Sequence, residues 1–163
     1  CLSIVLLYHI FSLCGVALIH MGQTGGEFIG EKKRNRYQLN SSLGRPLSLD
    51  AVAKAFPELT FIMAHNGYPY MVEAWAVAAN NPNVYLDISG SGPWVDSTPI
   101  VHSALGGNAF IPIDLNKVIW GSDNCLPQDE SIQRAAAYMR LMGADRSQRQ
   151  AIFGDTARKL YHL

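Results

Sequence analysis

The sequence predicts an α/β fold with parallel strands, and three observations support this prediction. Short, continuously apolar runs recur along the 163 residues, and each ends at a polar residue. Such runs are typical of strands buried on both faces, as in parallel sheets. Helical stretches with recognisable ends separate the runs, so strand and helix alternate throughout. With 48% hydrophobic side chains the chain is long enough for one sizeable core, and we treat residues 1–163 as one unit.

Four strands are predicted, and each delivers a polar side chain at its C-terminal end. The first runs into His20, the second into His65, the third into Asp87, and the fourth into Gly121-Ser122-Asp123. Their apolar residues are Val16–Ile19, Thr60–Ala64, Asn83–Leu86 and Lys117–Trp120.

The stretches between and after these strands predict helices. Ser48 is the expected N-cap of the first helix, and Pro57 ends that helix just before the second strand. Asparagine, proline and glycine residues end the helices that follow. The predicted helices cover residues 49–56, 70–79, 100–105 and 130–142, with a helical tail at 146–153 and 156–160.

Alternation of strand and helix fits either an open doubly wound sheet or a closed barrel, and periodicity does not choose between them. A full (β/α)₈ barrel needs about 250 residues, or about 31 for each unit. Four units in this chain would therefore make half a barrel with long loops. The longest loop, roughly residues 23–46, has the length of a lid or substrate loop, and disorder is equally compatible with its composition.

The charge balance gives no indication of a charged partner. Lys and Arg total 13 and match 13 Asp and Glu, so no net field attracts nucleic acid or an anionic membrane. The basic run from Lys32 to Arg36 is expected to be a solvated loop. Three cysteines without a CxxC pair suit a reducing compartment, and we expect a cytoplasmic protein.

The first 19 residues contain no charged side chain if His9 is neutral, and their length would suffice for a membrane helix. They start without Lys or Arg, however, and Gly15 interrupts them. We therefore expect two buried elements rather than a membrane span or a signal peptide. Because the chain opens on Cys1 inside an apolar run, we also expect that an upstream segment is missing.

His20, His65 and Asp123 are the candidate active-site residues. In parallel α/β sheets the C-terminal ends of the strands line the ligand site, and all three residues occupy that position. Their spacings fit roughly one and two βα units, so one sheet would deliver them to a shared mouth. Two imidazoles and one carboxylate are ligands that Zn²⁺ accepts while keeping a position open for water. The sequence therefore predicts a divalent metal site, with zinc as the first choice and manganese as the alternative.

Each of these residues also has an ordinary structural interpretation. A single His after a strand is often a hydrogen-bonded core residue, and an Asp after Gly-Ser is often a helix cap or turn former. Their equivalent places on three strands favour the functional interpretation of the set.

Other polar residues are weaker candidates. Asp87 and Ser89 end the third strand and are possible substrate contacts, although residues 83–92 also fit a strand that runs into a glycine-rich turn. Cys125 lies near the proposed mouth, but no motif around it supports a nucleophile. Three histidines in helical or terminal stretches are expected to be structural or exposed: His9, His102 and His162.

Five groups of short sequence motifs occur in a fixed order and together resemble a known family. They are Ile19-His20-Met21-Gly22, then Phe56-Pro57-Glu58-Leu59 leading to Ala64-His65-Asn66-Gly67, then Pro82 to Ser89, Trp120-Gly121-Ser122-Asp123, and Ile152 to Tyr161. In this order they resemble the second half of the amidohydrolase-2 family, relatives of aminocarboxymuconate-semialdehyde decarboxylase and of the resorcylate decarboxylases. The resemblance covers residues 13–161 and implies a partial (β/α)₈ TIM barrel, approximately strands 5 to 8 with their helices.

The resemblance implies a role for each candidate. His20 matches the family's metal-binding histidine at the end of the fifth strand, and Asp123 matches the metal-binding aspartate after the eighth, which also accepts a proton from the activated water. His65 matches the sixth-strand histidine, which lies beside the metal and orients or protonates the reacting group. The implied reactions are hydrolysis of C–N or C–O bonds and nonoxidative decarboxylation or hydration of a small organic substrate. A planar carboxylated or aromatic substrate follows from the family alone.

One departure from the family concerns the metal shell. The family also uses a His-x-His pair on its first strand, and no such pair occurs in these 163 residues. Two ligands, or three with His65, hold zinc poorly without the rest of the shell. We therefore expect an enzyme where the N-terminal half is present and, as the alternative, an inactive half-barrel that serves as a binding or assembly module. Its apolar edge strands predict self-association or pairing with the missing half.

Overall fold

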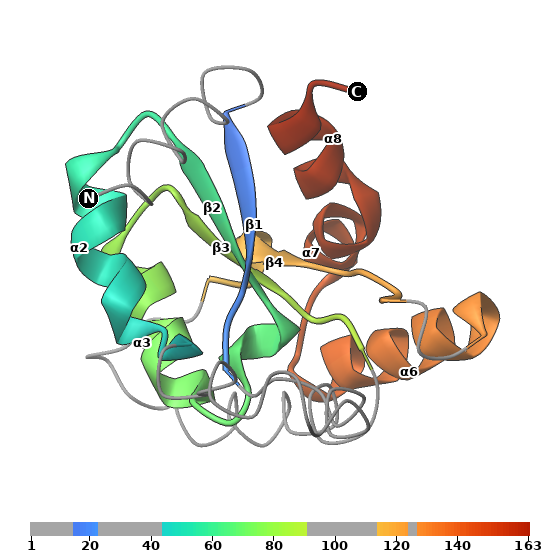
Figure 1. Ribbon diagram of the computed structural model, residues 1–163. Coiled ribbons are helices and arrows are strands. Elements are labelled where there is room, and N and C mark those ends of the chain that lie inside the picture. Colours follow the sequence, from blue (N-terminus) through green and yellow to red (C-terminus); the bar gives the residue numbers. More distant parts are fainter. Residues whose placement is uncertain (1–14, 23–43, 91–113, 124–126) are drawn as a thin grey trace, which may run out of the picture.

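The computed structural model describes residues 15–22, 44–90, 114–123 and 127–163, in which strands and helices alternate (Figure 1). The elements along the chain are β1 (Val16–His20), α2 (Leu47–Ala55), β2 (Thr60–Ala64), η3 (His65–Gly67), α3 (Met71–Asn80), β3 (Val84–Asp87), η4 (Leu115–Lys117), β4 (Val118–Ile119), α6 (Gln128–Leu141), α7 (Arg146–Gln150), η5 (Ala151–Asp155) and α8 (Thr156–Tyr161).

The strands form one parallel sheet in the order β1-β2-β3-β4. His20 lies opposite Ala64, so β1 and β2 end level with each other. A doubly wound sheet reverses its strand order at a switch point, and these four strands show no reversal. The order is that of a segment of a (β/α)₈ barrel, and the predicted fold class is confirmed.

The core lies between the sheet and the helices that pack on it. Helices α2 and α3 contact each other and lie together on one side of the sheet (Figure 1). Phe61, Met63 and Leu86 are at most 1% exposed and belong to the same apolar cluster. Each side chain of this size contributes about 1.5–3 kcal/mol when it is fully buried. On β1, by contrast, Leu18 is 60% exposed, and among the described residues this strand pairs only with β2.

Strand β2 has the predicted bounds, whereas β4 is shorter than predicted. Lys117 belongs to the short helix η4, and the amide of Trp120 donates to the carbonyl of Ile152 at 3.0 Å. Trp120 therefore leaves the sheet because its amide is bound by the C-terminal helical segment.

The predicted N-cap of α2 is wrong. The helix begins at Leu47 after Pro46, which already has helical φ and ψ of −55° and −33°. Proline suits this position because its fixed φ is helical and its missing N–H would have no partner there. Ser48 lies in the first turn, and its hydroxyl donates to the carbonyl of Arg45 at 2.7 Å. The predicted end is one residue too late, since α2 stops at Ala55 and not at Phe56.

The C-terminal helices follow the predicted pattern with one addition. Helix α6 ends before Gly143, whose φ is 74°. Asp145 then caps α7, because its side chain accepts from the Gln148 amide at 2.8 Å and the Gln148 side chain accepts from the Asp145 amide at 2.9 Å. Between α7 and α8 the chain makes a π-helical turn, η5, where the sequence predicts an interruption.

Some predicted features lie outside the described residues. They are the apolar segment before Gly15, nearly all of the long loop, the helix at 100–105, and the side chains of His9, His102 and Cys125. None of the helices in the described ranges has both the length and the hydrophobicity that a membrane span requires.

Candidate active site

The C-terminal ends of β1 and β2 bring two histidines together. β1 ends at His20, and His65 is the first residue after β2. Their ring centroids lie 4.8 Å apart, edge to face, with an interplanar angle of 66°. Because the two residues are remote along the chain, their contact depends on the parallel register that places His20 opposite Ala64.

Asp123 follows the end of β4 and acts electrostatically on the same cluster. Partial burial lowers the pKa of His20, the nearby His65 lowers it further, and the carboxylate of Asp123 raises it. Asp123 also raises the pKa of Asp87. The three candidates therefore lie near one another and near Asp87. The lowered pKa of His20 favours the neutral imidazole, which is the form that binds metal ions.

His65 is held from the end of β3. Its Nδ1 atom lies 3.1 Å from the Ser89 hydroxyl oxygen and 3.4 Å from the Ser89 carbonyl oxygen. The Ser89 hydroxyl donates to Oδ2 of Asp87 at 2.8 Å. All three residues are buried. A short chain of hydrogen bonds thus connects the imidazole to a carboxylate through one hydroxyl group.

Asp87 is a buried acid with one oxygen unsatisfied. Burial raises its pKa to about 6, against the lowering effects of the Ser89 hydrogen bond and of His65. Its Oδ1 atom is buried and has no hydrogen-bond partner among the described residues. Gly121 packs closely here, since a Cβ at this position would lie 3.4 Å from Oδ1 and 3.2 Å from the Ser89 Cβ. A shifted pKa and an unsatisfied polar atom are both typical of functional sites.

Backbone conformation singles out the same region. His65, Asn66 and Asp123 have φ values of 55°, 55° and 50°, in the left-handed region that residues with side chains seldom adopt. Each such conformation costs about 1–3 kcal/mol and is common at active sites, where the surrounding structure holds it. Two of the three candidate residues thus carry backbone strain.

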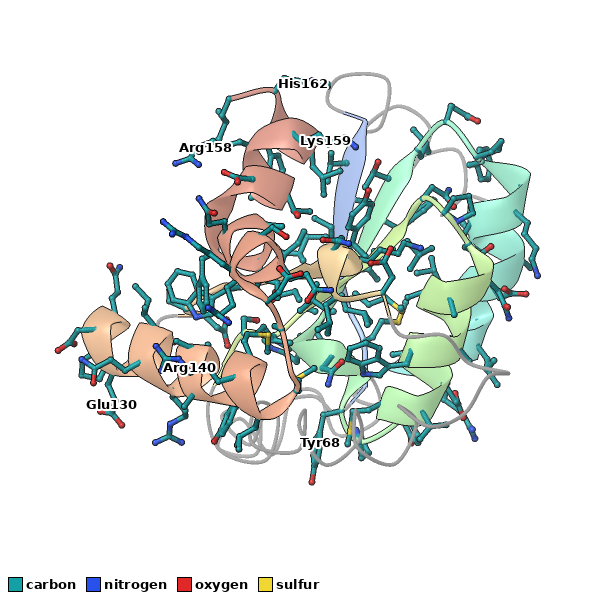
Figure 2. The ribbon with its side chains drawn as sticks, turned by 180° about the vertical axis from the view of Figure 1, so that it is seen from behind. Tyr68, Glu130, Arg140, Arg158, Lys159 and His162 are labelled. Carbon is teal, nitrogen blue, oxygen red and sulfur yellow. The ribbon has the colours of Figure 1, made fainter. Side chains whose placement is uncertain are left out.

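The loops that follow β1 and β2 pack tightly at the mouth of this site. The amide of Gly22 donates to the carbonyl of Gly44 at 2.7 Å. A Cβ on Gly22 would collide with the carbonyl of Tyr68, and the φ of Gly22 is 85°. Glycine is therefore required here for both space and conformation. The Tyr68 side chain lies at this end of the molecule (Figure 2).

Arg45, just before α2, and Tyr70, just before α3, interact with each other. Arg45 forms an ion pair with Glu73, and its guanidinium lies 5.0 Å from the centroid of the Tyr70 ring. The charge of Arg45 is therefore compensated by Glu73 within the protein.

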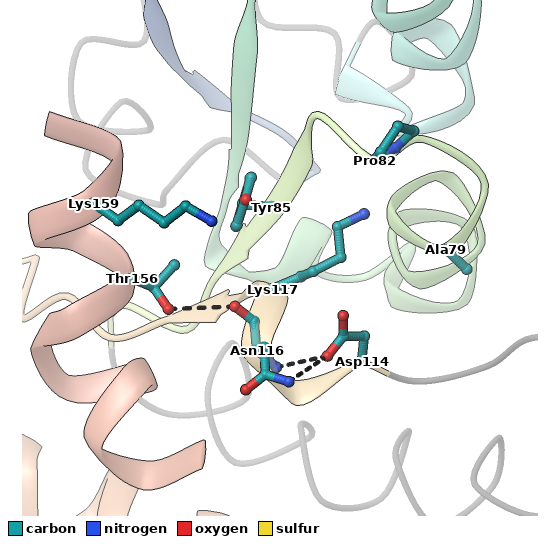
Figure 3. A pocket seen from close by; sticks show the side chains of 8 residues that line it. All are labelled: Ala79, Pro82, Tyr85, Asp114, Asn116, Lys117, Thr156 and Lys159. Carbon is teal, nitrogen blue, oxygen red and sulfur yellow. Dashed lines mark hydrogen bonds between the residues drawn. The ribbon is translucent and has the colours of Figure 1, made fainter. Parts of the chain in front are cut away.

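A pocket of about 510 Å³ lies away from this site, where β3 and β4 begin (Figure 3). It is lined in part by Tyr85 and Lys117. The ammonium group of Lys117 donates to the carbonyls of Ala78 and Asn81 at the end of α3, which stabilises the helix C-terminus. Burial lowers the pKa of Lys117. Its interactions are structural, as is usual at this end of barrel strands.

The donor atoms of the site suit a metal ion in kind but do not complete its shell. Neutral imidazole and carboxylate are ordinary zinc ligands. In the described part of the chain, no group of three or more His, Cys, Asp or Glu side chains lies close enough together to hold a metal ion. The chain therefore offers part of a ligand set, in agreement with the missing His-x-His pair.

The sequence did not reveal the connection between Ser89 and His65. It suggested substrate contact for Asp87 and Ser89, whereas the structure shows both in the hydrogen-bond chain to His65. The available signal was the spacing of two polar residues at alternate positions after an apolar run. His162 is exposed, as expected, and lies at the end of the molecule opposite Tyr68 (Figure 2).

Comparisons with known proteins agree with this fold. A family model described as Amidohydrolase matches residues 16–163. Protein fluG of Emericella nidulans is 32% identical over 85 residues, which are 52% of this chain and 10% of fluG. A crystal structure of an amidohydrolase from Burkholderia multivorans with bound zinc has a TM-score of 0.55 and 18% identity, covering 72% of this chain and 49% of that one. The chain thus spans about a tenth of fluG and about half of the bacterial protein.

Proposed function

The chain belongs to the amidohydrolase family, and from this premise we propose that it carries half of the active site of a metal-dependent hydrolase. The observation that supports this most is the 4.8 Å contact between the His20 and His65 rings at the C-terminal ends of adjacent strands. That end of a parallel barrel is where active sites lie. The bacterial amidohydrolase of the same fold has bound zinc, which supports zinc as the metal.

In this proposal, His20 and the carboxylate of Asp123 would bind the metal, and the His65 ring would lie beside it as a third donor. A divalent cation held there supplies Lewis-acid chemistry, polarising a substrate oxygen and activating water near neutral pH. Asp123 would accept a proton from the attacking water, and His65 would orient or protonate the reacting group. Partial burial and the lowered pKa of His20 leave its imidazole neutral for binding.

The substrate of this proposed hydrolase is a small organic molecule with a C–N or C–O bond to cleave. The alternative reaction is nonoxidative decarboxylation of a carboxylated aromatic molecule, since the sequence motifs resemble those of decarboxylases in the same family. The two reactions differ in product, because hydrolysis consumes water and leaves the carboxylate whereas decarboxylation releases CO₂.

A second candidate function is an inactive half-barrel that serves as a binding or assembly module. It is favoured by one observation: the described residues contain no group of three donors able to hold a metal.

The full-length protein that contains these residues allows the two functions to be separated. Bound zinc and manganese would be measured by mass spectrometry, and hydrolysis would be assayed on lactones, esters and amides with and without a chelator. We expect stoichiometric metal and chelator-sensitive hydrolysis, both lost in His20→Ala and both kept in the matched control His162→Ala. CO₂ release from carboxylated aromatics would indicate the decarboxylase. Absence of metal and of both activities from the intact protein would favour the assembly module.

A further inference from the structure

We propose that Ser89 is a positioning residue that holds His65 in the tautomer with its proton on Nδ1, so that Nε2 is the acceptor nitrogen. Both the hydroxyl and the backbone carbonyl of Ser89, which follows the end of β3, lie next to Nδ1 of His65. Only the role of Nε2 in binding or proton transfer rests on the proposed function. The tautomer itself is a property of the metal-free chain.

The tautomer follows from counting the protons around Nδ1. Ser89 has one hydroxyl proton, which it donates to Oδ2 of Asp87 at 2.8 Å. Towards His65, at 3.1 Å, the hydroxyl oxygen therefore presents a lone pair. The second neighbour of Nδ1 is the Ser89 carbonyl oxygen at 3.4 Å, which only accepts. Both neighbours are acceptors, so the Nδ1 atom must carry the proton.

The opposite tautomer would leave three lone pairs facing one another in a buried place. Ser89 is 4% exposed and His65 is 8% exposed, so water competes poorly for these groups. Gly121 packs closely against Ser89 and Asp87. A Cβ at its position would lie only 3.2 Å from the Ser89 Cβ. The hydroxyl is therefore held between the carboxylate and the ring.

This tautomer determines what His65 can do. A neutral imidazole with its proton on Nδ1 has its lone pair on Nε2, and only that nitrogen can bind a cation or accept a proton. Histidines that bind metals commonly have their other nitrogen fixed in this way by an oxygen acceptor. Ser89 thus acts on the reaction through His65 and has no need to contact the substrate.

Nitrogen-15 NMR of the metal-free chain tests the proposal directly. The spectrum would be recorded at about pH 8, above the ordinary histidine pKa of about 6.5, where the two ring nitrogens of each tautomer have different chemical shifts. We expect the Nδ1 of His65 to have the shift of a protonated nitrogen and its Nε2 the shift of a bare one. In Ser89→Ala the tautomer ratio should move by about fivefold or more towards the Nε2-protonated form, because one buried hydrogen bond is lost. Ser89→Cys, a weaker acceptor of similar size, should lie between the two.

Signals of the exposed His162 provide the reference for an imidazole in water, and the dispersion of the backbone amide signals shows whether each variant is folded. A bare Nδ1 in the wild-type spectrum would overturn the proposal, even if no variant folds. An unchanged tautomer in a folded Ser89→Ala variant would overturn it too. The NMR result is independent of catalysis. If the predicted tautomer is found but the protein has no metal and no hydrolase activity, only the proposed function is refuted. If the protein shows metal-dependent hydrolysis but His65 has the opposite tautomer, only the role of Ser89 is refuted.

Discussion

The buried carboxylate of Asp87 should make the metal-free chain less stable as the pH rises. Its pKa is about 6 in the folded chain, whereas an aspartate in an unfolded chain titrates at about 3.9. Between these values the folded state holds more protons than the unfolded state, so the free energy of unfolding falls as the pH increases. A difference of about two pH units corresponds to about 3 kcal/mol. Asp87 is only 9% exposed, so solvent screening reduces this value little.

Asp87→Asn removes this titration and keeps the shape of the side chain and an oxygen for Ser89. The free energy of unfolding would be measured by urea denaturation from pH 4 to pH 7, with a chelator present because a bound cation changes nearby pKa values. The wild-type chain should lose about 2 kcal/mol more than the variant across this range, because at pH 4 the unfolded carboxyl is already half ionised. Asp129→Asn, on the exposed surface of α6, controls for the loss of one carboxylate. Parallel curves for the wild type and Asp87→Asn would refute the reasoning.

Three further predictions concern catalysis, packing and assembly. In the intact enzyme, His65→Asn should lower turnover by about 100-fold or more, the typical effect of a positioned proton-transfer group, and wild-type rates would exclude His65 from the mechanism. Asn83 donates to three backbone carbonyls between the end of α2 and the start of β2. Asn83→Ala should therefore lower the free energy of unfolding by about 1–3 kcal/mol in urea titrations, and an unchanged midpoint would contradict this. The chain should form dimers or aggregates at micromolar concentration, and Leu18→Lys on β1 should reduce them because a charged edge strand opposes pairing. A monomeric wild-type peak in light scattering would count against that prediction.

The strands could be predicted from the sequence because burial on both faces requires a continuous apolar run. β2 has the predicted bounds for this reason. β4 ends earlier than predicted because the amide of Trp120 is bound by Ile152, a contact between distant segments that no local pattern shows. The cap of α2 was wrong because the local preference of Ser48 for an N-cap was overridden by Pro46.

The candidate site could be predicted only as far as strand ends reveal it. His20, His65 and Asp123 could be chosen because each follows an apolar run, and parallel strands end at one edge. The chain of hydrogen bonds from Asp87 through Ser89 to His65 could not be predicted, since it depends on how β2 and β3 lie against each other. The left-handed backbone of His65 and Asp123 also has no sequence signal, because it is imposed by the surrounding structure.

The central claim is that His20 and Asp123 bind one divalent cation in the full-length protein and that the His65 ring lies beside it. Anomalous X-ray scattering at the zinc edge, from crystals of the full-length protein grown with zinc, would locate that ion directly. We expect one strong peak about 2 Å from a ring nitrogen of His20 and from the carboxylate of Asp123, with the His65 ring beside it. A peak elsewhere in the protein, with the functional atoms of the three residues more than about 10 Å apart, would contradict the claim.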